Sequence, residues 1–170
     1  MIETPFQFRV SDLLGKPGAH RSVQFSVGLP LAMDMARVVS DVDVDLRFDA
    51  TSRDIVASGR IDFDIVATCN RCLRGIDQHL SPKFSQVFGT PSTDDEDAAE
   101  VLPLGPQGEI DLESTIVDEI GVTLPLSSAC RDDCLGLCPT CGTDLNREPC
   151  EGHEDLLSSP FAVLQDFLEN

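Results

Sequence analysis

The chain has 170 residues, 41% of them hydrophobic, which suits a single domain with its own core, although Trp and Tyr are absent. Thirty acidic residues against twelve basic ones give a formal net charge of -18, which disfavours direct binding to nucleic acid and favours a basic protein partner. No membrane span is expected, and the first residues lack the basic and apolar regions of a signal peptide, so we expect a cytoplasmic protein.

Alternating apolar and charged residues predict the central strands. Residues 42–48 alternate with a period of two, as a half-buried strand does. Residues 55–69 repeat this pattern and are the expected partner strand. A third segment, 76–89, is expected to pair back, which gives a mainly antiparallel sheet with Cys69 and Cys72 at a turn between strands.

Two segments with different composition follow the predicted sheet. Residues 91–108 are rich in acidic residues, Pro and Gly, and they predict an acidic mobile loop. Residues 109–121 predict a short amphipathic helix with an acidic outer face, in which Asp111 is the cap and Gly121 the end. The apolar residues of this helix are spaced four apart and share one face: Leu112, Ile116 and Ile120.

The last predicted element is a C-terminal helix at residues 159–169. Ser159 suits its N-cap, a proline follows at the first helical position, and apolar residues form one stripe. We expect this helix to pack on the sheet of its own domain. The whole chain is therefore predicted to be one α+β domain over 1–170, with a β-rich body at 1–90 and a C-terminal zinc-knuckle segment at 130–153.

Cysteines supply the strongest chemical pattern. The odd total of seven leaves one thiol over from any set of intrachain disulfides, and the expected compartment is reducing. Two Cys-x2-Cys pairs each present two sulfurs to one point, the arrangement that tetrahedral zinc prefers, so we predict one or two Zn2+ ions. The eight predicted metal ligands are Cys69, Cys72, Cys130, Cys134, Cys138, Cys141, Cys150 and His153.

Two groupings of these ligands are open. In the first, the last four ligands share an ion through a small local loop, and the first four form a second site that joins the sheet to the C-terminal segment. In the alternative, the two Cys-x2-Cys pairs share one ion, as in zinc ribbons. Gly142, after the second pair, suits the left-handed conformation that turns backbone N–H groups toward the sulfurs.

Catalytic motifs are missing from the sequence. It has no His-Glu-x-x-His, no phosphate-binding glycine loop and no Gly-x-Ser-x-Gly elbow. A catalytic zinc keeps an open position, whereas thiolate-rich sites are closed, so we expect structural zinc and no enzyme. A thiol oxidoreductase using Cys138 and Cys141 is the alternative, although the strand-to-helix context of thioredoxins is absent.

Four motifs, in the same order, resemble the bacterial YceD family, also called DUF177. They are CNRCL, EIDLESTIVDEIGVTLPL, CLGLCPTCGTDLN and SPFAVLQDFL, and the resemblance covers most of the chain from about Val39 onward. It implies a non-enzymatic, cytoplasmic role in large ribosomal subunit biogenesis, namely the accumulation of 23S ribosomal RNA.

The acidic composition and this resemblance together suggest a partner. We expect the chain to bind a basic large-subunit ribosomal protein or a ribosome assembly factor, so that any association with precursor ribosomal RNA is indirect. The competing hypothesis is direct RNA binding by an arginine patch near the first cysteine pair. That patch would consist of Arg53, Arg60, Arg71 and Arg74.

Overall fold

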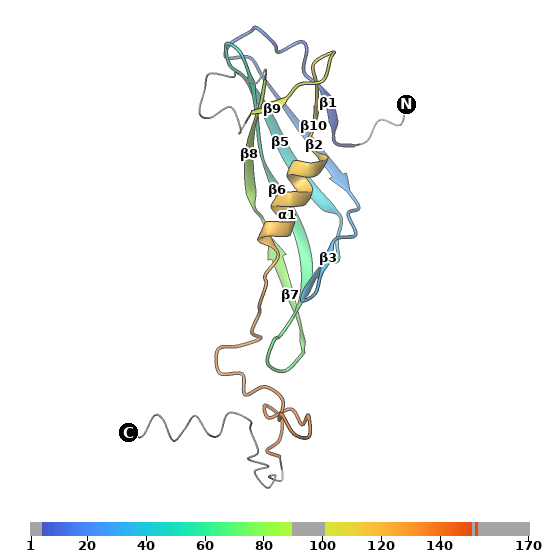
Figure 1. Cartoon of the computed structure of the whole chain (residues 1–170), viewed down its shortest axis with the longest axis vertical. Coiled ribbons are helices and arrows are strands. Elements are labelled where there is room, and N and C mark those ends of the chain that lie inside the picture. The colour runs from blue at the N-terminus through green and yellow to red at the C-terminus, as the bar shows by residue number, and fades with distance from the viewer. Residues whose placement is uncertain (1–4, 90–100, 151, 153–170) are drawn as a thin grey trace, which may run out of the picture.

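The computed structural model describes residues 5–89, 101–150 and 152. The described chain is elongated, with a β-sheet and one helix at one end and a segment without helix or strand at the other (Figure 1). The predicted C-terminal helix at 159–169, most of the predicted acidic loop, and His153 lie outside these residues.

Two sheets and a helix make up the regular structure of the described residues. The larger sheet is antiparallel except for one parallel pair, β8 with β9. Its eight strands are β2 (His20–Val27), β3 (Ala32–Met33), β4 (Ala36–Val38), β5 (Val42–Ala50), β6 (Ile55–Thr68), β7 (Gly75–Leu80), β8 (Lys83–Gly89) and β9 (Val101–Pro103). A two-stranded sheet and the helix complete the fold: β1 (Gln7–Arg9), β10 (Glu109–Asp111) and α1 (Glu113–Thr123).

Strand β6 is the centre of the larger sheet. Its first half pairs with β5 on one edge and β8 on the other, and its second half pairs with β4 and β7. The predicted strands at 42–48 and 55–69 are confirmed as β5 and β6. The third predicted segment is two strands, β7 and β8, and both pair back onto β6 as expected.

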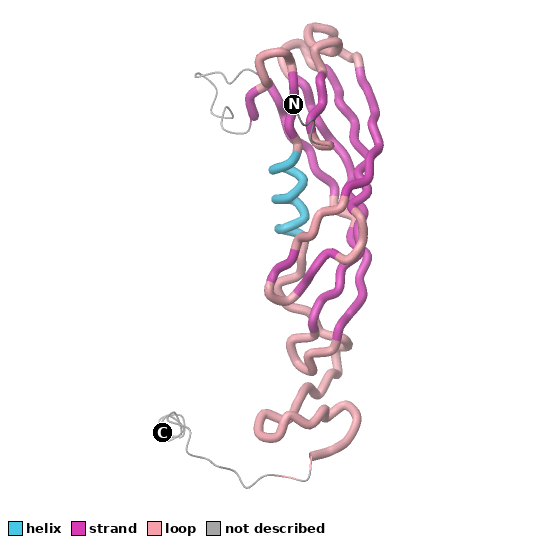
Figure 2. Tube along the Cα trace, turned by 90° about the vertical axis from the view of Figure 1, so that its right-hand side faces the viewer, coloured by secondary structure: helices cyan, strands magenta, loops and turns pink. Residues whose placement is uncertain are grey.

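The core lies between one face of the larger sheet and a second layer formed by α1 and the β1–β10 pair (Figure 2). Alternation along β5 and β6 places every second side chain in this core, because successive side chains point to opposite faces of a strand. From the second layer, Ile110, Leu112, Ile116 and Ile120 are fully buried. Burial of each such side chain contributes about 1.5–3 kcal/mol.

The predicted helix at 109–121 is wrong at both ends. Residues 109–111 form β10, because they pair with β1, which is distant in the sequence. The helix continues through Gly121 to Thr123. Asp111 does accept a hydrogen bond at 2.9 Å from the N–H of Glu113, so its carboxylate satisfies one free donor of the first turn.

Part of the predicted mobile loop is also structured. Residues 101–103 form β9, which pairs in parallel with β8. No helix among the described residues has the length and apolar character needed to cross a bilayer.

Two glycines in this fold predict opposite effects of substitution by alanine. A Cβ at Gly59 in β6 would overlap the carbonyl oxygen of Asp45 and lie 2.9 Å from the ring of Phe84, whereas a Cβ at Gly121 in α1 meets nothing within 4 Å. We expect Gly59→Ala to lower the free energy of unfolding by about 1–3 kcal/mol through overpacking. Gly121→Ala should raise it by about 0.5–1 kcal/mol, because alanine favours the helix.

Chemical denaturation of the two purified variants and the parent protein measures both effects. Equal stability of the three proteins would contradict the packing described for β6.

Candidate metal centre

The candidate site lies at the end of the sheet, where the turn after β6 meets the segment that follows α1. That segment, residues 125–150, runs past the tip of β7 and contains no helix or strand (Figures 1 and 2). It contacts the turn through a parallel bridge between Cys69 and Ser128, in which the N–H of Asn70 donates to the carbonyl of Ser128 at 2.9 Å.

Four thiols converge at this contact. The sulfur atoms of Cys69, Cys72, Cys130 and Cys134 all lie within 4.8 Å of one another. The Cys72 and Cys130 sulfurs are 3.6 Å apart, and those of Cys69 and Cys134 are 4.0 Å apart. With Zn–S bonds of about 2.3 Å, tetrahedral geometry separates the sulfurs by about 3.8 Å. The four thiols are therefore spaced as the ligands of a tetrahedral ion; we call them the four-thiol centre.

Backbone N–H groups point at one sulfur of this centre. The N–H of Cys130 donates to the Cys69 sulfur at 3.4 Å. Hydrogen bonds from the backbone of Cys72 and Cys130 lower the pKa of Cys69 to about 6. Burial, reinforced by neighbouring thiols, raises the pKa of Cys130 to about 12. A thiolate at one sulfur therefore disfavours a second thiolate beside it. A divalent cation among the four would compensate this repulsion.

Arg71 joins the turn to the segment. Its guanidinium donates to the carbonyls of Asp132 and Cys134 at 3.0 and 3.1 Å, and its own carbonyl accepts from the N–H of Leu137 at 3.0 Å. Gly136 lies against the same backbone with φ +78°, and a Cβ there would be 3.1 Å from the Arg71 carbonyl oxygen. Arg71 thus holds the loop that carries Cys134.

These contacts bear on the arginine patch. Arg60 forms an ion pair with Asp62 at 3.1 Å, and Arg74 forms one with Asp144 at 3.7 Å. Together with the carbonyl contacts of Arg71, they give three of the four arginines partners within the chain. The patch therefore offers less positive charge to RNA than its sequence suggests.

Asn146 is a contributor to the site that the sequence patterns did not identify. Its amide nitrogen donates to the Cys134 sulfur at 3.5 Å and to Asp144 at 2.7 Å, and its amide oxygen accepts from the N–H of Leu135 at 2.9 Å. The side chain thus fixes both the loop around Cys134 and the orientation of its sulfur. The only sequence signal is the Asp-Leu-Asn turn, which resembles many surface turns.

Three other predicted ligands, Cys138, Cys141 and Cys150, are not part of the four-thiol centre, and His153 lies outside the described residues. Cys138 is buried, Cys150 is partly buried and Cys141 is exposed. The structure therefore brings together the first four predicted ligands, as in the first grouping, and this group does not contain both Cys-x2-Cys pairs.

Comparison with known proteins gives a consistent match. The family model described as "Large ribosomal RNA subunit accumulation protein YceD" matches residues 57–168, a range that contains all eight predicted ligands. An uncharacterised protein of Mycobacterium leprae is 33% identical over 174 residues, covering 97% of this chain and 78% of that protein. The large ribosomal RNA subunit accumulation protein YceD of Haemophilus influenzae is 33% identical over 147 residues, covering 79% of this chain and 78% of that protein. No solved structure matches the chain.

Replacing Arg71 tests whether its guanidinium holds the Cys134 loop. We expect Arg71→Met to increase the alkylation rate of Cys130 and Cys134 by about tenfold, because loss of two hydrogen bonds at about 0.5–1.5 kcal/mol each favours opening of the loop. Mass spectrometry after a short pulse of iodoacetamide measures this rate. The matched control is Arg53→Met, at an exposed position between β5 and β6. The assignment fails if the two variants react at the same rate.

Proposed function

The chain belongs to the YceD family, and we propose that it is a zinc-stabilised, non-enzymatic cytoplasmic factor that supports large ribosomal subunit biogenesis and 23S ribosomal RNA accumulation. The observation that carries this proposal is the family match together with the Haemophilus influenzae relative, which is named for large ribosomal RNA subunit accumulation. The four-thiol centre and the charge of the sheet support the mechanism proposed below.

Zinc fits the four-thiol centre by the chemistry of its donors. Four thiolates at tetrahedral spacing complete the coordination of a structural Zn2+ and leave no position for a substrate or for water. The amide of Asn146 and the N–H of Cys130 would each donate to a coordinating sulfur. The ion would thus hold the segment after α1 against the end of the sheet, which is a structural role.

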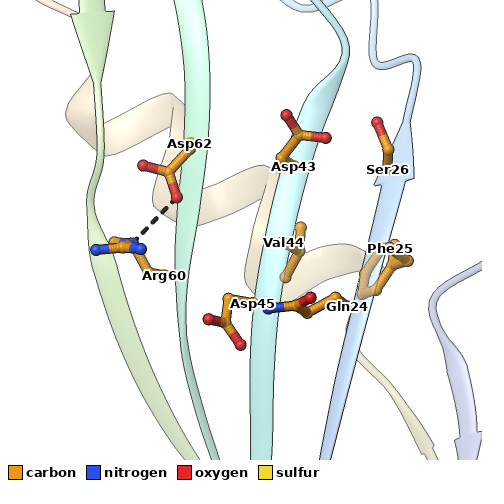
Figure 3. A pocket seen from close by; sticks show the side chains of 8 residues that line it. All are labelled: Gln24, Phe25, Ser26, Asp43, Val44, Asp45, Arg60 and Asp62. Carbon is orange, nitrogen blue, oxygen red and sulfur yellow. Dashed lines mark hydrogen bonds and ion pairs between the residues drawn. The ribbon is translucent and has the colours of Figure 1, made fainter.

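The outer face of the sheet is suited to a basic partner. Asp43 on β5 lies directly opposite Asp62 on β6, and like charges in such a pair destabilise a sheet (Figure 3). The Ser81 hydroxyl, with smaller contributions from Arg60 and His79, holds the pKa of Asp62 below its ordinary value, so this carboxylate stays charged. A cationic partner bound at this face would neutralise the two carboxylates, which would explain why the sheet carries a destabilising pair.

The same face has a shape that can receive side chains. Asp43, Asp45 and Asp62 line a hollow of about 440 Å³ between β2, β5 and β6, on the side away from α1 (Figure 3). Arg60 also lines this hollow, so its three carboxylates outnumber one cation. Lysine or arginine side chains of a basic ribosomal protein or assembly factor would neutralise these carboxylates. A bound partner could then be delivered to precursor RNA, or be shielded until RNA is available, and RNA left without its partner would be degraded.

Metal removal tests the structural role of the four-thiol centre. Elemental analysis of the purified full-length protein should find at least one zinc per chain, and Cys69→Ser with Cys134→Ser should lose one. Chelation should lower the free energy of unfolding by about 4 kcal/mol or more, the linkage expected for a ligand at 1,000 times its Kd. Metal-free protein that melts unchanged, with all thiols open to alkylation, would contradict the zinc role.

Neutralising the outer face of the sheet tests the basic partner. The bait is the full-length protein, incubated at low salt with proteins extracted from large ribosomal subunits and washed from ribosomes, or separately with ribosomal RNA. We expect retention of a basic protein without RNA, and about tenfold weaker retention by Asp43→Asn with Asp45→Asn, equivalent to about 1.4 kcal/mol. Removing Asp43 relieves its repulsion with Asp62, whereas removing Asp45 loses an attraction to Arg60 opposite it, so the double variant should keep about the stability of the parent protein.

The matched control removes the same number of negative charges, two, from the opposite side of the sheet. Glu113→Gln with Asp118→Asn alters two exposed acidic residues of α1 and should bind as the parent protein does. Retention of RNA alone, or an equal loss of protein binding in both variants, would count against the proposed face.

A further inference from the structure

The turn after β6 has a specific backbone conformation. The N–H of Leu73 donates to the carbonyl of Cys69 at 2.9 Å, and the N–H of Cys69 donates to the carbonyl of Arg74 at 2.8 Å. Leu73 takes the left-handed conformation with φ +58°, and it is the one residue other than glycine with positive φ among the described residues. For leucine this conformation costs about 1–2 kcal/mol. The turn therefore keeps a strained shape at the position where it presents two sulfurs to the four-thiol centre.

A second turn, residues 138–143, has the same hydrogen-bond pattern. The N–H of Gly142 donates to the carbonyl of Cys138 at 2.9 Å, and the N–H of Cys138 donates to the carbonyl of Thr143 at 2.8 Å. Gly142 takes φ +74°, the position that Leu73 holds in the first turn. The two turns have the same residue only at their two cysteine positions. We therefore attribute their shared backbone conformation to the Cys-x2-Cys spacing.

A third thiol lies at the second turn. The backbone of Cys141 and Thr140 and the thiols of Cys141 and Cys150 all lie within interaction range of the Cys138 sulfur. Cys138 is 6% exposed although it lies in a segment with no helix or strand, and Cys150 is partly buried. Two further thiols therefore lie near the Cys138 sulfur, although the three sulfurs are not all as close to one another as those of the four-thiol centre.

From this geometry we propose that the chain has a second metal site, in which Cys138, Cys141 and Cys150 bind a thiophilic divalent cation of the zinc class. The site is distinct from the four-thiol centre, which contains none of these residues. The fourth ligand offered by the sequence, His153, lies outside the described residues. The inference goes beyond the proposed function, which needs the ion of the four-thiol centre alone.

The two sites share one loop. The N–H of Leu145 donates to the carbonyl of Gly136 at 3.0 Å, and Leu137 pairs with Asp144 in an antiparallel bridge. This bridge closes the second turn, and Asn146, just beyond it, donates to the Cys134 sulfur at 3.5 Å. An ion in the second turn would hold this loop, and the loop in turn positions one sulfur of the four-thiol centre.

A dithiol used for thiol exchange is the competing role for Cys138 and Cys141. Such pairs precede a helix whose N-terminus stabilises the attacking thiolate. Here the residues after the pair form a turn and a bridge, with no helix in the described segment up to residue 150. The backbone around this pair is instead that of the turn at Cys69 and Cys72, which presents two sulfurs to the four-thiol centre.

Metal stoichiometry tests the second site. The full-length protein is loaded with zinc, freed of excess metal and measured by native mass spectrometry and elemental analysis. We expect two ions in the parent protein, one in Cys138→Ser with Cys141→Ser, and two in the control Thr140→Ser, which changes the same turn but keeps every sulfur. A Co2+ titration of the parent protein checks the count without any variant: thiolate-to-cobalt absorption should saturate at two equivalents.

Three outcomes would overturn the second site: one ion in the parent protein, an unchanged count after loss of Cys138 and Cys141, or a disulfide between these two in the loaded protein. The variant Cys69→Ser with Cys134→Ser separates this result from a failure of the four-thiol centre. If the parent protein and the Cys138 variant each hold one ion and the Cys69 variant holds none, the second site is wrong while the four-thiol centre stands.

Discussion

The convergence of four sulfurs beyond the end of β6 is the constraint on which the segment after α1, residues 125–150, depends. Cys72 and Cys130 are 58 positions apart, and closing a free loop of this length costs about 3–4 kcal/mol beyond a constant. Apolar burial in the core offsets most of this entropic cost, because Leu124 at the end of α1 is already buried there. Only residues 125–129 remain to span the distance, so the sheet brings the thiols near one another before any ion binds.

The described chain therefore contains two regions that are stabilised by different physical effects. The sheet, α1 and the β1–β10 pair share one aliphatic and aromatic cluster, whose stability comes from apolar burial. The second cluster consists of Cys69, Cys72 and Cys134, with only Ile76, Leu137 and Cys130 packed against it. So small an apolar cluster cannot order a segment without helix or strand, so the shape of that segment rests on hydrogen bonds and on coordination.

How far the sequence predicts this structure depends on the range of the interactions. Alternation in β5 and β6 is local, so it identified both strands and the turn at Cys69. The start of α1 was misplaced because β10 exists only through its pairing with β1, and no local pattern shows that partner. The spacing of cysteines predicted the four-thiol centre as one of two groupings. The roles of Arg71 and Asn146 depend on contacts across the assembled site, where each residue type is ordinary in its local sequence.

The distribution of charge links the metal centre to the proposed partner. Near the thiols, Arg71 and Arg74 contact a carbonyl or a carboxylate of the segment after α1, so positive charge is used to assemble the site. On the outer face of the sheet, Asp43 and Asp62 remain opposite each other, with Arg60 paired to only one of them. Arginines near the thiols are thus paired within the chain, whereas Asp43 on the sheet has no ion pair with any described residue. Such a charge distribution repels phosphate and attracts lysine and arginine, which is why we propose that the chain affects ribosomal RNA through a basic protein.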